Sequence, residues 1–272
     1  MRLRISRYLV DSEKIPEEMN GCRIAVLADL HDCEVGKKNS RLLAALRQEQ
    51  PNCVLLAGDM VVENVKCCRA RLAYRKAREF LIALAKEFPV YYGMGNHESR
   101  WKKNVDSHSM TFERFRQELE DEGIIFLDNR SVVLGNGDRG VRITGLELPL
   151  PYYQRKIRIP HLTGAAIRKL AGEADQQHFQ ILLAHSPQFF QGYGDWGADL
   201  ALAGHFHGGM IRLPVAGGVI STYCRLFPKY DRGMFVKKNR RMIVSAGLGT
   251  HTIPLRINNP PELIFLELTH RG

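Results

Sequence analysis

Short apolar runs alternate with amphipathic segments along the first third of the chain, and this alternation restricts the fold more than any other feature. Strands are expected at residues 23–28, 53–57 and 90–94, and helices at residues 40–48 and 69–88 between them. Strands that are apolar along their whole length are typical of a sheet covered on both faces. The order therefore predicts parallel strands joined by helices in an α/β fold.

The rest of the chain adds one charged amphipathic helix and further short strands. The helix is expected at residues 110–122, where Gly123 ends it. Additional strands are expected at residues 124–127, 131–134, 141–144, 181–184, 200–203, 242–246 and 263–268. Gly135-Asn136-Gly137 separates two of them and predicts a hairpin turn.

The composition is that of an ordinary folded protein. The chain has 272 residues, of which 44% are hydrophobic and 25% charged, which excludes a disordered chain, a collagen and a small disulfide scaffold. Without an internal repeat or a low-complexity linker, we predict a single domain over residues 1–272 with two sheets. Two long loops, at residues 148–162 and 221–235, are expected to be functional or mobile, and the first carries the basic run 155–158.

The net charge bears on the chemical class of the binding partner, and the cysteines bear on the cellular compartment. Lysine and arginine total 39 against 29 acidic residues, a net charge of +10. This excess suggests an anionic partner, namely a phosphorylated small molecule, nucleic acid or an acidic membrane surface, with a merely solvated basic surface as the alternative that charge alone does not exclude. Six cysteines without a CxxC zinc pattern indicate a reducing compartment. With no secretory signal and no long apolar run, we expect a cytoplasmic protein without a transmembrane segment, and contact with the membrane periphery stays open.

Five short blocks place metal-binding side chain types directly after expected strands. They are Asp29-Leu30-His31, Gly58-Asp59, Gly95-Asn96-His97-Glu98, His185 and Gly204-His205-Phe206-His207. Sites form at strand ends because the sheet holds the backbone while the loops present side chains. Each block alone has an ordinary structural interpretation, such as a turn-capping aspartate or a core histidine. Their combination is much more specific.

In order and spacing the five blocks resemble the motifs of the calcineurin-like metallophosphoesterase superfamily, from Asp-x-His at residue 29 to Gly-His-x-His at residue 207. The resemblance implies a metallo-dependent phosphatase-like α/β fold, a four-layer α-β-β-α sandwich of two mixed sheets flanked by helices. The glycine- and proline-rich segments that follow residue 207 are similar to those of a bacterial branch of this superfamily, whose members are often membrane-anchored or exported.

The resemblance also implies a centre of two divalent metal ions. The ligands would be Asp29, His31, Asp59 and His207 for one ion, and Asp59, Asn96, His185 and His205 for the other, with Asp59 bridging. Carboxylate, imidazole and amide donors without a thiolate suit manganese, iron, zinc or cobalt alike. In such a centre a bridging hydroxide attacks phosphorus, and His97 is the candidate general acid for the leaving oxygen, with a supporting role beside the ligands as the alternative.

The expected function is hydrolysis of a phosphomonoester or phosphodiester bond in a small or lipid-linked substrate. The segment 58–63 lacks the arginine with which protein serine/threonine phosphatases grip phosphate, which argues against that class. Two alternatives stay open. A nuclease could use the same metals and the basic, aromatic segments 101–103 and 152–156. A non-catalytic binding scaffold is disfavoured because every expected ligand and His97 are present.

Overall fold

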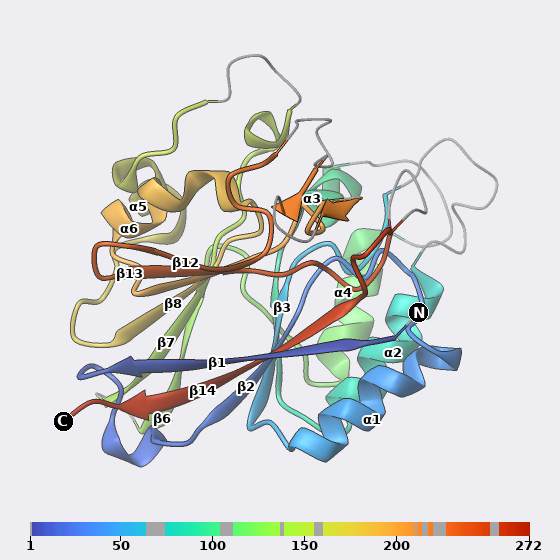
Figure 1. The fold of residues 1–272 in the computed structure, drawn as a ribbon, viewed down its shortest axis with the longest axis horizontal. Coiled ribbons are helices and arrows are strands. Elements are labelled where there is room, and N and C mark those ends of the chain that lie inside the picture. The colour runs from blue at the N-terminus through green and yellow to red at the C-terminus, as the bar shows by residue number, and fades with distance from the viewer. Residues whose placement is uncertain are drawn as a thin grey trace.

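Two six-stranded mixed sheets pack face to face, and helices cover their outer faces (Figure 1). This confirms the fold class expected from the sequence. The computed structural model of the protein describes residues 2–63, 74–103, 111–136, 139–154, 160–209, 211–213, 217–219, 227–250 and 256–272. None of the helices in these ranges combines the length and the apolar character that crossing a membrane requires.

The first sheet combines the N-terminal strands with the last strand of the chain. Its order is β1 (Arg4–Ser12), β14 (Glu262–His270), β2 (Arg23–Leu27), β3 (Cys53–Ala57), β4 (Val90–Gly93) and β5 (Ile125–Phe126). Strands β2 to β5 are parallel, whereas β14 runs antiparallel to β2. The C-terminal ends of β2, β3 and β4 therefore lie at the same edge of the sheet.

The second sheet is built in the same way from the middle of the chain. Its order is β12 (Gly233–Lys237), β13 (Arg240–Val244), β9 (Leu200–Ala203), β8 (Phe179–Leu183), β7 (Arg139–Gly145) and β6 (Ser131–Asn136). The four inner strands are parallel, and the edge strands β6 and β12 are antiparallel to their neighbours. A separate small pair, β10 (Arg212–Leu213) and β11 (Gly217–Gly218), lies outside both sheets.

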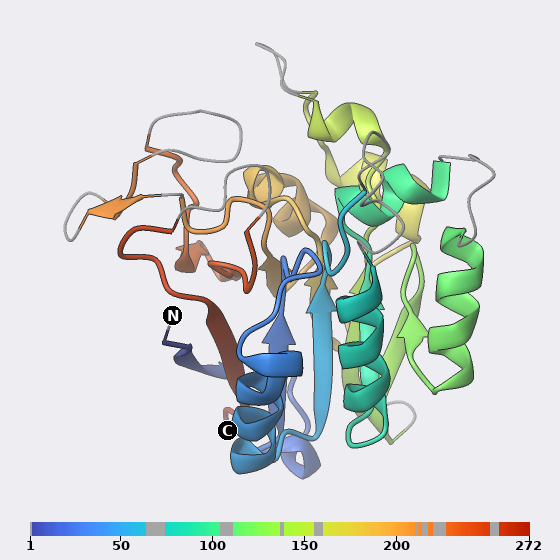
Figure 2. The same cartoon turned by 90° about the vertical axis from the view of Figure 1, so that its right-hand side faces the viewer.

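Helices cover the outer face of each sheet (Figure 2). Their apolar side chains pack against the sheet. The first sheet is covered by α1 (Ser40–Glu49), α2 (Arg75–Ala85) and α4 (Phe112–Asp121), and the second by α5 (Gly164–Ala171) and α6 (Phe190–Trp196). Local sequence explains the ends of α4: the hydroxyl of Thr111 accepts a hydrogen bond from the backbone N–H of Arg114, and Gly123 follows the helix with φ +93°.

The space between the sheets is filled by apolar side chains from both. The first sheet contributes Ile24, Val26 and Leu55, and the second contributes Val141, Ile181 and Leu202. Strands β3 and β9 are apolar on both faces, since one face packs on helices and the other on the opposite sheet. This arrangement is why the sequence shows continuous apolar runs rather than alternation.

The sequence prediction misses the edge strands β1 and β12, the small pair β10–β11 and the helices α3 (Asn96–Lys103), α5 and α6. It also extends the helix expected at residues 69–88 beyond the end of α2 at Ala85. β1 has a mostly exposed or half-buried pattern, so no apolar run marks it, and β12 begins inside the expected loop 221–235. The hairpin β6–β7 is confirmed, whereas the helix expected from residue 69 is described only as α2. Residues 64–73 lie outside the described part of the chain, as do Arg155, Lys156 and Arg158 of the basic loop.

We expect Leu55→Ala to destabilise the protein by about 2–5 kcal/mol, because Leu55 is fully buried between the sheets and its loss leaves a cavity. Urea unfolding of the metal-free protein measures this change. Leu9→Ala is the matched control, since Leu9 on β1 is 61% exposed and its truncation should change stability by less than about 0.5 kcal/mol. Equal losses in both variants would contradict the assignment of the core.

Candidate metal centre

The five blocks of expected ligands meet at one edge of the sandwich. Their metal-binding side chains form three buried groups, each with donor atoms within 4.8 Å of one another: Asp29, His31 and His207; His31, Asp59 and His97; and Asp59, His185 and His205. The first sheet supplies the blocks after β2, β3 and β4, and the second those after β8 and β9. Because His31 and Asp59 each belong to two groups, the groups make one continuous cluster.

Sharp backbone turns aim these side chains into the cluster. The backbone φ angle lies between +50° and +72° at Asp29, His31, Asp59, His205 and His207. This left-handed region costs an L-residue about 1–2 kcal/mol and is retained where the surroundings over-determine it. In a straight strand, His205 and His207 would both point to one face, whereas the turn directs them to different groups of the same cluster.

Two motif glycines allow the ligand loops to approach each other. A Cβ atom on Gly95 would lie 2.2 Å from Oδ1 of Asp59, and one on Gly204 would lie 2.3 Å from Oδ2 of Asp29. No side chain fits at either position, because the obstructing atoms belong to the cluster itself. Close packing against the cluster therefore explains the glycines of the third and fifth motif blocks, Gly95 and Gly204.

Backbone carbonyl groups orient two of the imidazole rings. Nδ1 of His185 lies 2.7 Å from the carbonyl oxygen of Ala57, and Nδ1 of His207 lies 3.3 Å from that of Gly249. In both rings Nδ1–H donates, so in the neutral form Nε2 keeps its lone pair for the cluster. Such carbonyl partners are the usual support of a metal-binding histidine.

The atoms inside the cluster face one another as ligands of a common cation do. Nε2 of His185 lies 2.9 Å from Oδ2 of Asp59, yet this buried nitrogen has no partner with hydrogen-bond geometry. Nε2 of His207 lies 3.0 Å from Nε2 of His31. A buried set of carboxylate and imidazole donors fits a divalent transition-metal ion.

The side-chain amide of Asn96 has two orientations with different consequences. With its oxygen beside Nδ1 of His205, both atoms direct lone pairs to one point, as two ligands of one cation would. In the other orientation its nitrogen donates to that Nδ1 at 2.9 Å and its oxygen accepts from Arg100 at 3.0 Å. Hydrogen bonding within the protein favours the second orientation, and a bound cation favours the first.

Opposite charges dominate the electrostatics of the cluster. Burial alone would raise the pKa of the Asp29 and Asp59 carboxyl groups, but the surrounding imidazoles hold both pKa values well below the ordinary range. Burial lowers the pKa of His205 and of His207 to about 3. For His185, burial acts to lower the pKa, and the carboxylate of Asp59 outweighs it and raises the pKa to about 10. A cation that binds His185 must therefore displace a proton.

Two residues near the cluster were not found from the sequence. The ring of Tyr153, in a short 3-10 helix at Leu150–Tyr153, lies 5.5 Å from that of His205 and 6.2 Å from that of His185. The guanidinium of Arg256 donates to the carbonyl oxygen of Gly249, the same group that orients His207. The sequence marks Tyr153 only as part of the aromatic segment 152–156 and Arg256 only as part of the segments after residue 207, and no local signal places either beside the cluster.

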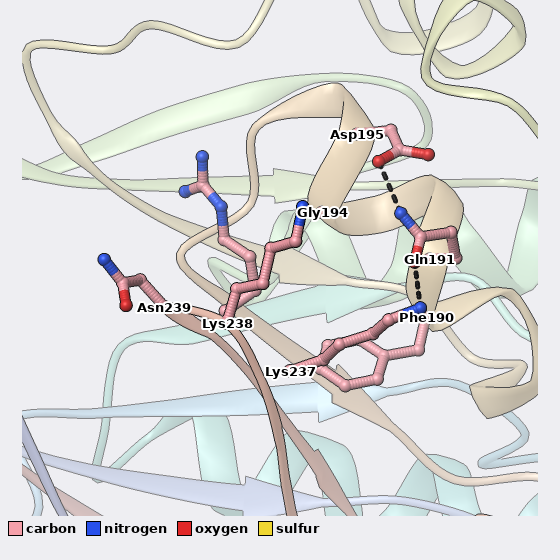
Figure 3. Close-up of a pocket in the computed structure, with 8 residues that line it drawn as sticks. Phe190, Gln191, Gly194, Asp195, Lys237, Lys238 and Asn239 are labelled. Atoms are coloured by element: carbon pink, nitrogen blue, oxygen red, sulfur yellow. Dashed lines mark hydrogen bonds between the residues drawn. The ribbon is translucent and has the colours of Figure 1, made fainter.

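A separate pocket lies between α6 and the turn that joins β12 to β13 (Figure 3). It encloses about 390 Å³ and is lined by Phe190, Gln191, Gly194, Asp195, Lys237, Lys238, Asn239 and Arg240. Three of its polar side chains are linked, since Lys237 donates to Gln191 and Gln191 donates to Asp195. β13 begins at this pocket and runs parallel to β9, which leads to His205 at its far end. The pocket is therefore distinct from the metal cluster.

Comparison with known proteins identifies the family. The model of the calcineurin-like phosphoesterase family matches residues 22–209, a range that includes all five blocks. The chain belongs to the calcineurin-like phosphoesterases. This confirms the resemblance seen in the motifs, and members of the family are hydrolases that use divalent metals.

Relatives of this calcineurin-like phosphoesterase cover most of its length. The uncharacterised metallophosphoesterase YkuE of Bacillus subtilis (strain 168) is 36% identical over 271 residues, 98% of this chain and 85% of the relative. Phosphodiesterase YaeI of Escherichia coli (strain K12) is 26% identical over 248 residues, covering 90% and 82%. Among solved structures, phosphopantetheinyl hydrolase PptH from Mycobacterium tuberculosis has a TM-score of 0.45 at 14% identity, covering 84% of this chain and 91% of the other.

We expect Asp59→Asn to lower metal binding more than Asp29→Asn, because Asp59 belongs to two of the three groups and Asp29 to one. The affinity of the purified protein for Mn²⁺ should fall by more than about tenfold in Asp59→Asn. Elemental analysis of both variants after loading and dialysis checks the prediction. Two ions retained at full occupancy in Asp59→Asn would show that this carboxylate does not bridge.

Proposed function

We propose that this protein is a dinuclear metal-dependent phosphoesterase that hydrolyses a phosphomonoester or phosphodiester bond in a small or lipid-linked substrate. The observation that carries the proposal is the single buried cluster in which Asp59 and His31 belong to two groups each. The name of the relative YaeI, a phosphodiesterase, supports the reaction class.

The proposed ligands divide between two ions as the family resemblance implies. One ion would be held by Asp29, His31, Asp59 and His207, and the other by Asp59, Asn96, His185 and His205. Two divalent cations bound there would supply Lewis-acid activation of water and of the phosphoryl group. The protein's part is to hold the donors in place: His185 and His207 are oriented by backbone carbonyls, and the carboxylate of Asp29 accepts the backbone N–H of His205 at 3.0 Å.

His97 is the proposed general acid. Its Nδ1 accepts a hydrogen bond from the backbone N–H of Glu63 at 3.2 Å, so the neutral ring carries its proton on Nε2. The ring lies 4.9 Å from that of His31, in an edge-to-face arrangement, at the border of the cluster. To act as a general acid, His97 would give the Nε2 proton of its imidazolium form to the leaving oxygen while the ester bond breaks and return to the neutral ring. In the imidazolium form Nδ1 also carries a proton and no longer accepts from the N–H of Glu63.

Internal packing of the aromatic side chains favours a small substrate over nucleic acid. Trp101 packs against Tyr74 and Phe115, with ring centroids 5.4 and 5.2 Å apart, and Tyr153 is buried. Lys102 is paired with Glu147 at 2.9 Å. These are side chains that a groove for single-stranded nucleic acid would expose for stacking and phosphate contact. A DNA band shift that weakens with salt would restore the nuclease alternative.

The fold and the cysteines support two further parts of the proposal. The first and the last strand, β1 and β14, pair along nine residues, which supports a single catalytic domain over residues 1–272. The cysteines within the described ranges, Cys22, Cys33 and Cys53, are free thiols, as the proposed reducing compartment requires.

One assay panel tests the proposed function. The metal-free protein is reconstituted separately with manganese, iron, zinc or cobalt and given p-nitrophenyl phosphate, bis-p-nitrophenyl phosphate, cyclic nucleotides and nucleotide-linked lipids. We expect metal-dependent hydrolysis that a chelator removes and that Asp59→Asn lacks. Stoichiometric metal binding without hydrolysis of any ester would instead support a binding scaffold.

We expect His97→Ala to keep its metals and to lose activity according to the leaving group. The loss should be about 10²–10⁴-fold for an alkyl phosphoester, whose alkoxide leaves poorly without a proton. It should be much smaller for a p-nitrophenyl ester, because p-nitrophenolate leaves as an anion. Steady-state rates on the two esters check this. Equal losses would assign His97 to charge stabilisation, and lost metal would make it a ligand.

A further inference from the structure

A fully buried carboxylate connects the loop that carries Asp59 to the loop that carries Asn96. This carboxylate belongs to Glu98, at the start of α3 (Asn96–Lys103), and its exposed fraction is 0%. It accepts five hydrogen bonds of 2.8–3.3 Å, from the backbone N–H groups of Asp59, Met60, Val61 and Gly95 and from the hydroxyl of Tyr92. Four of the five donors are thus backbone groups of the two ligand loops.

The same two loops are also joined in the opposite direction. Oδ1 of Asp59 accepts a hydrogen bond from the backbone N–H of His97 at 2.8 Å. Glu98 thus holds the backbone of Asp59, and the side chain of Asp59 holds the backbone next to Asn96. Because a carboxylate presents about four lone-pair directions, the donors saturate Glu98 and fix the loops in one relative position.

Glu98 supports the ligands and is absent from the groups of described residues that could hold a metal ion. Burying a carboxylate is costly unless hydrogen bonds compensate it fully, so a core position without a special demand favours an apolar side chain. Here the compensation comes from the loops themselves. The carboxylate of Glu98 is thus a strong acceptor shared by backbone N–H groups from two separate loops, and it holds these loops together.

We propose that Glu98 is the positioning residue of the metal centre, which sets the separation of Asp59 and Asn96 before any cation binds. The inference rests on the proposed function, in which these two residues are ligands. Ligands that are already held in place lose less conformational entropy when a cation binds. Loss of Glu98 should therefore weaken cation binding more than its effect on the folding stability alone explains.

The test compares metal affinity with stability in Glu98→Gln. Glutamine keeps the shape but turns an amide N–H₂ group toward backbone N–H donors. The metal-free full-length protein is titrated with Mn²⁺ by calorimetry, and its urea unfolding is measured in parallel. We expect the dissociation constant to rise by about 10–100-fold, the usual effect of removing a partner of metal ligands. Tyr92→Phe, which removes one donor of five, should raise it by a smaller factor.

Asp199→Asn is the matched control for a structural effect alone. Asp199 precedes β9, at the opposite end of that strand from His205. Its carboxylate also accepts a backbone N–H, from Gln180 at 2.9 Å, and pairs with Lys14 and Arg240. We expect this variant to be destabilised while its affinity for Mn²⁺ stays at the wild-type value.

The outcomes separate the inference from the proposed function. An unchanged dissociation constant in Glu98→Gln, or a change no larger than that of an equally destabilised Asp199→Asn, would overturn the positioning role. If Glu98→Gln does not fold, Tyr92→Phe decides, and wild-type affinity there would overturn it too. If Asp59→Asn binds Mn²⁺ as the wild type does, the metal centre itself is wrong.

Discussion

The hydrogen bond from the backbone N–H of His205 to the carboxylate of Asp29 joins the two sheets at the metal centre, and the geometry of the cluster depends on it. Asp29 follows the first sheet's β2, and His205 follows the second sheet's β9. A buried carboxylate is stable only when hydrogen bonds or opposite charges replace the water around it. The loop after β9 supplies such a hydrogen bond to Asp29, which holds the second sheet's loop against the first sheet's loop. Nε2 of His31 also faces this carboxylate, 3.7 Å from Oδ1 of Asp29, and both residues are proposed metal ligands.

Backbone hydrogen bonds extend this constraint from one loop to the next. The N–H groups of Asp29 and His31 donate to the carbonyl oxygens of Gly58 and Asp59, and the N–H of Gly249 donates to Asp29. The residues of the turns can therefore keep their left-handed φ values, since the neighbouring loops hold them. A site with ligands held by backbone contacts rather than by flexible side chains is ready for a cation, which is what phosphoryl chemistry requires.

The sequence predicts the inner strands of both sheets well and their edges poorly. Residues 53–57 and 200–203 are fully buried, so hydrophobicity alone marks the strands β3 and β9. β1 pairs with β14 along its whole length, but one of its sides lies at the edge of the sheet and its residues are mostly half-buried or exposed. β12 is another edge strand with the same ambiguity. Whether such a segment forms a strand depends on a pairing partner that is distant in sequence, which for β1 is Glu262–His270.

By itself, the sequence determined the motifs, their order and the family, and it predicted the residues of the candidate metal centre, because each motif is local to one strand end. Only the tertiary structure decided which of these residues share a group, as with His31 and His207, which lie in different sheets' loops. It also decided which ring nitrogen donates to each backbone carbonyl. The role of Glu98 likewise needs the tertiary structure, because its five donors come from two separate segments, residues 59–61 and 92–95. The reason is physical: burial, charge compensation and hydrogen-bond partners arise when separate strand ends meet, and no local pattern encodes that meeting.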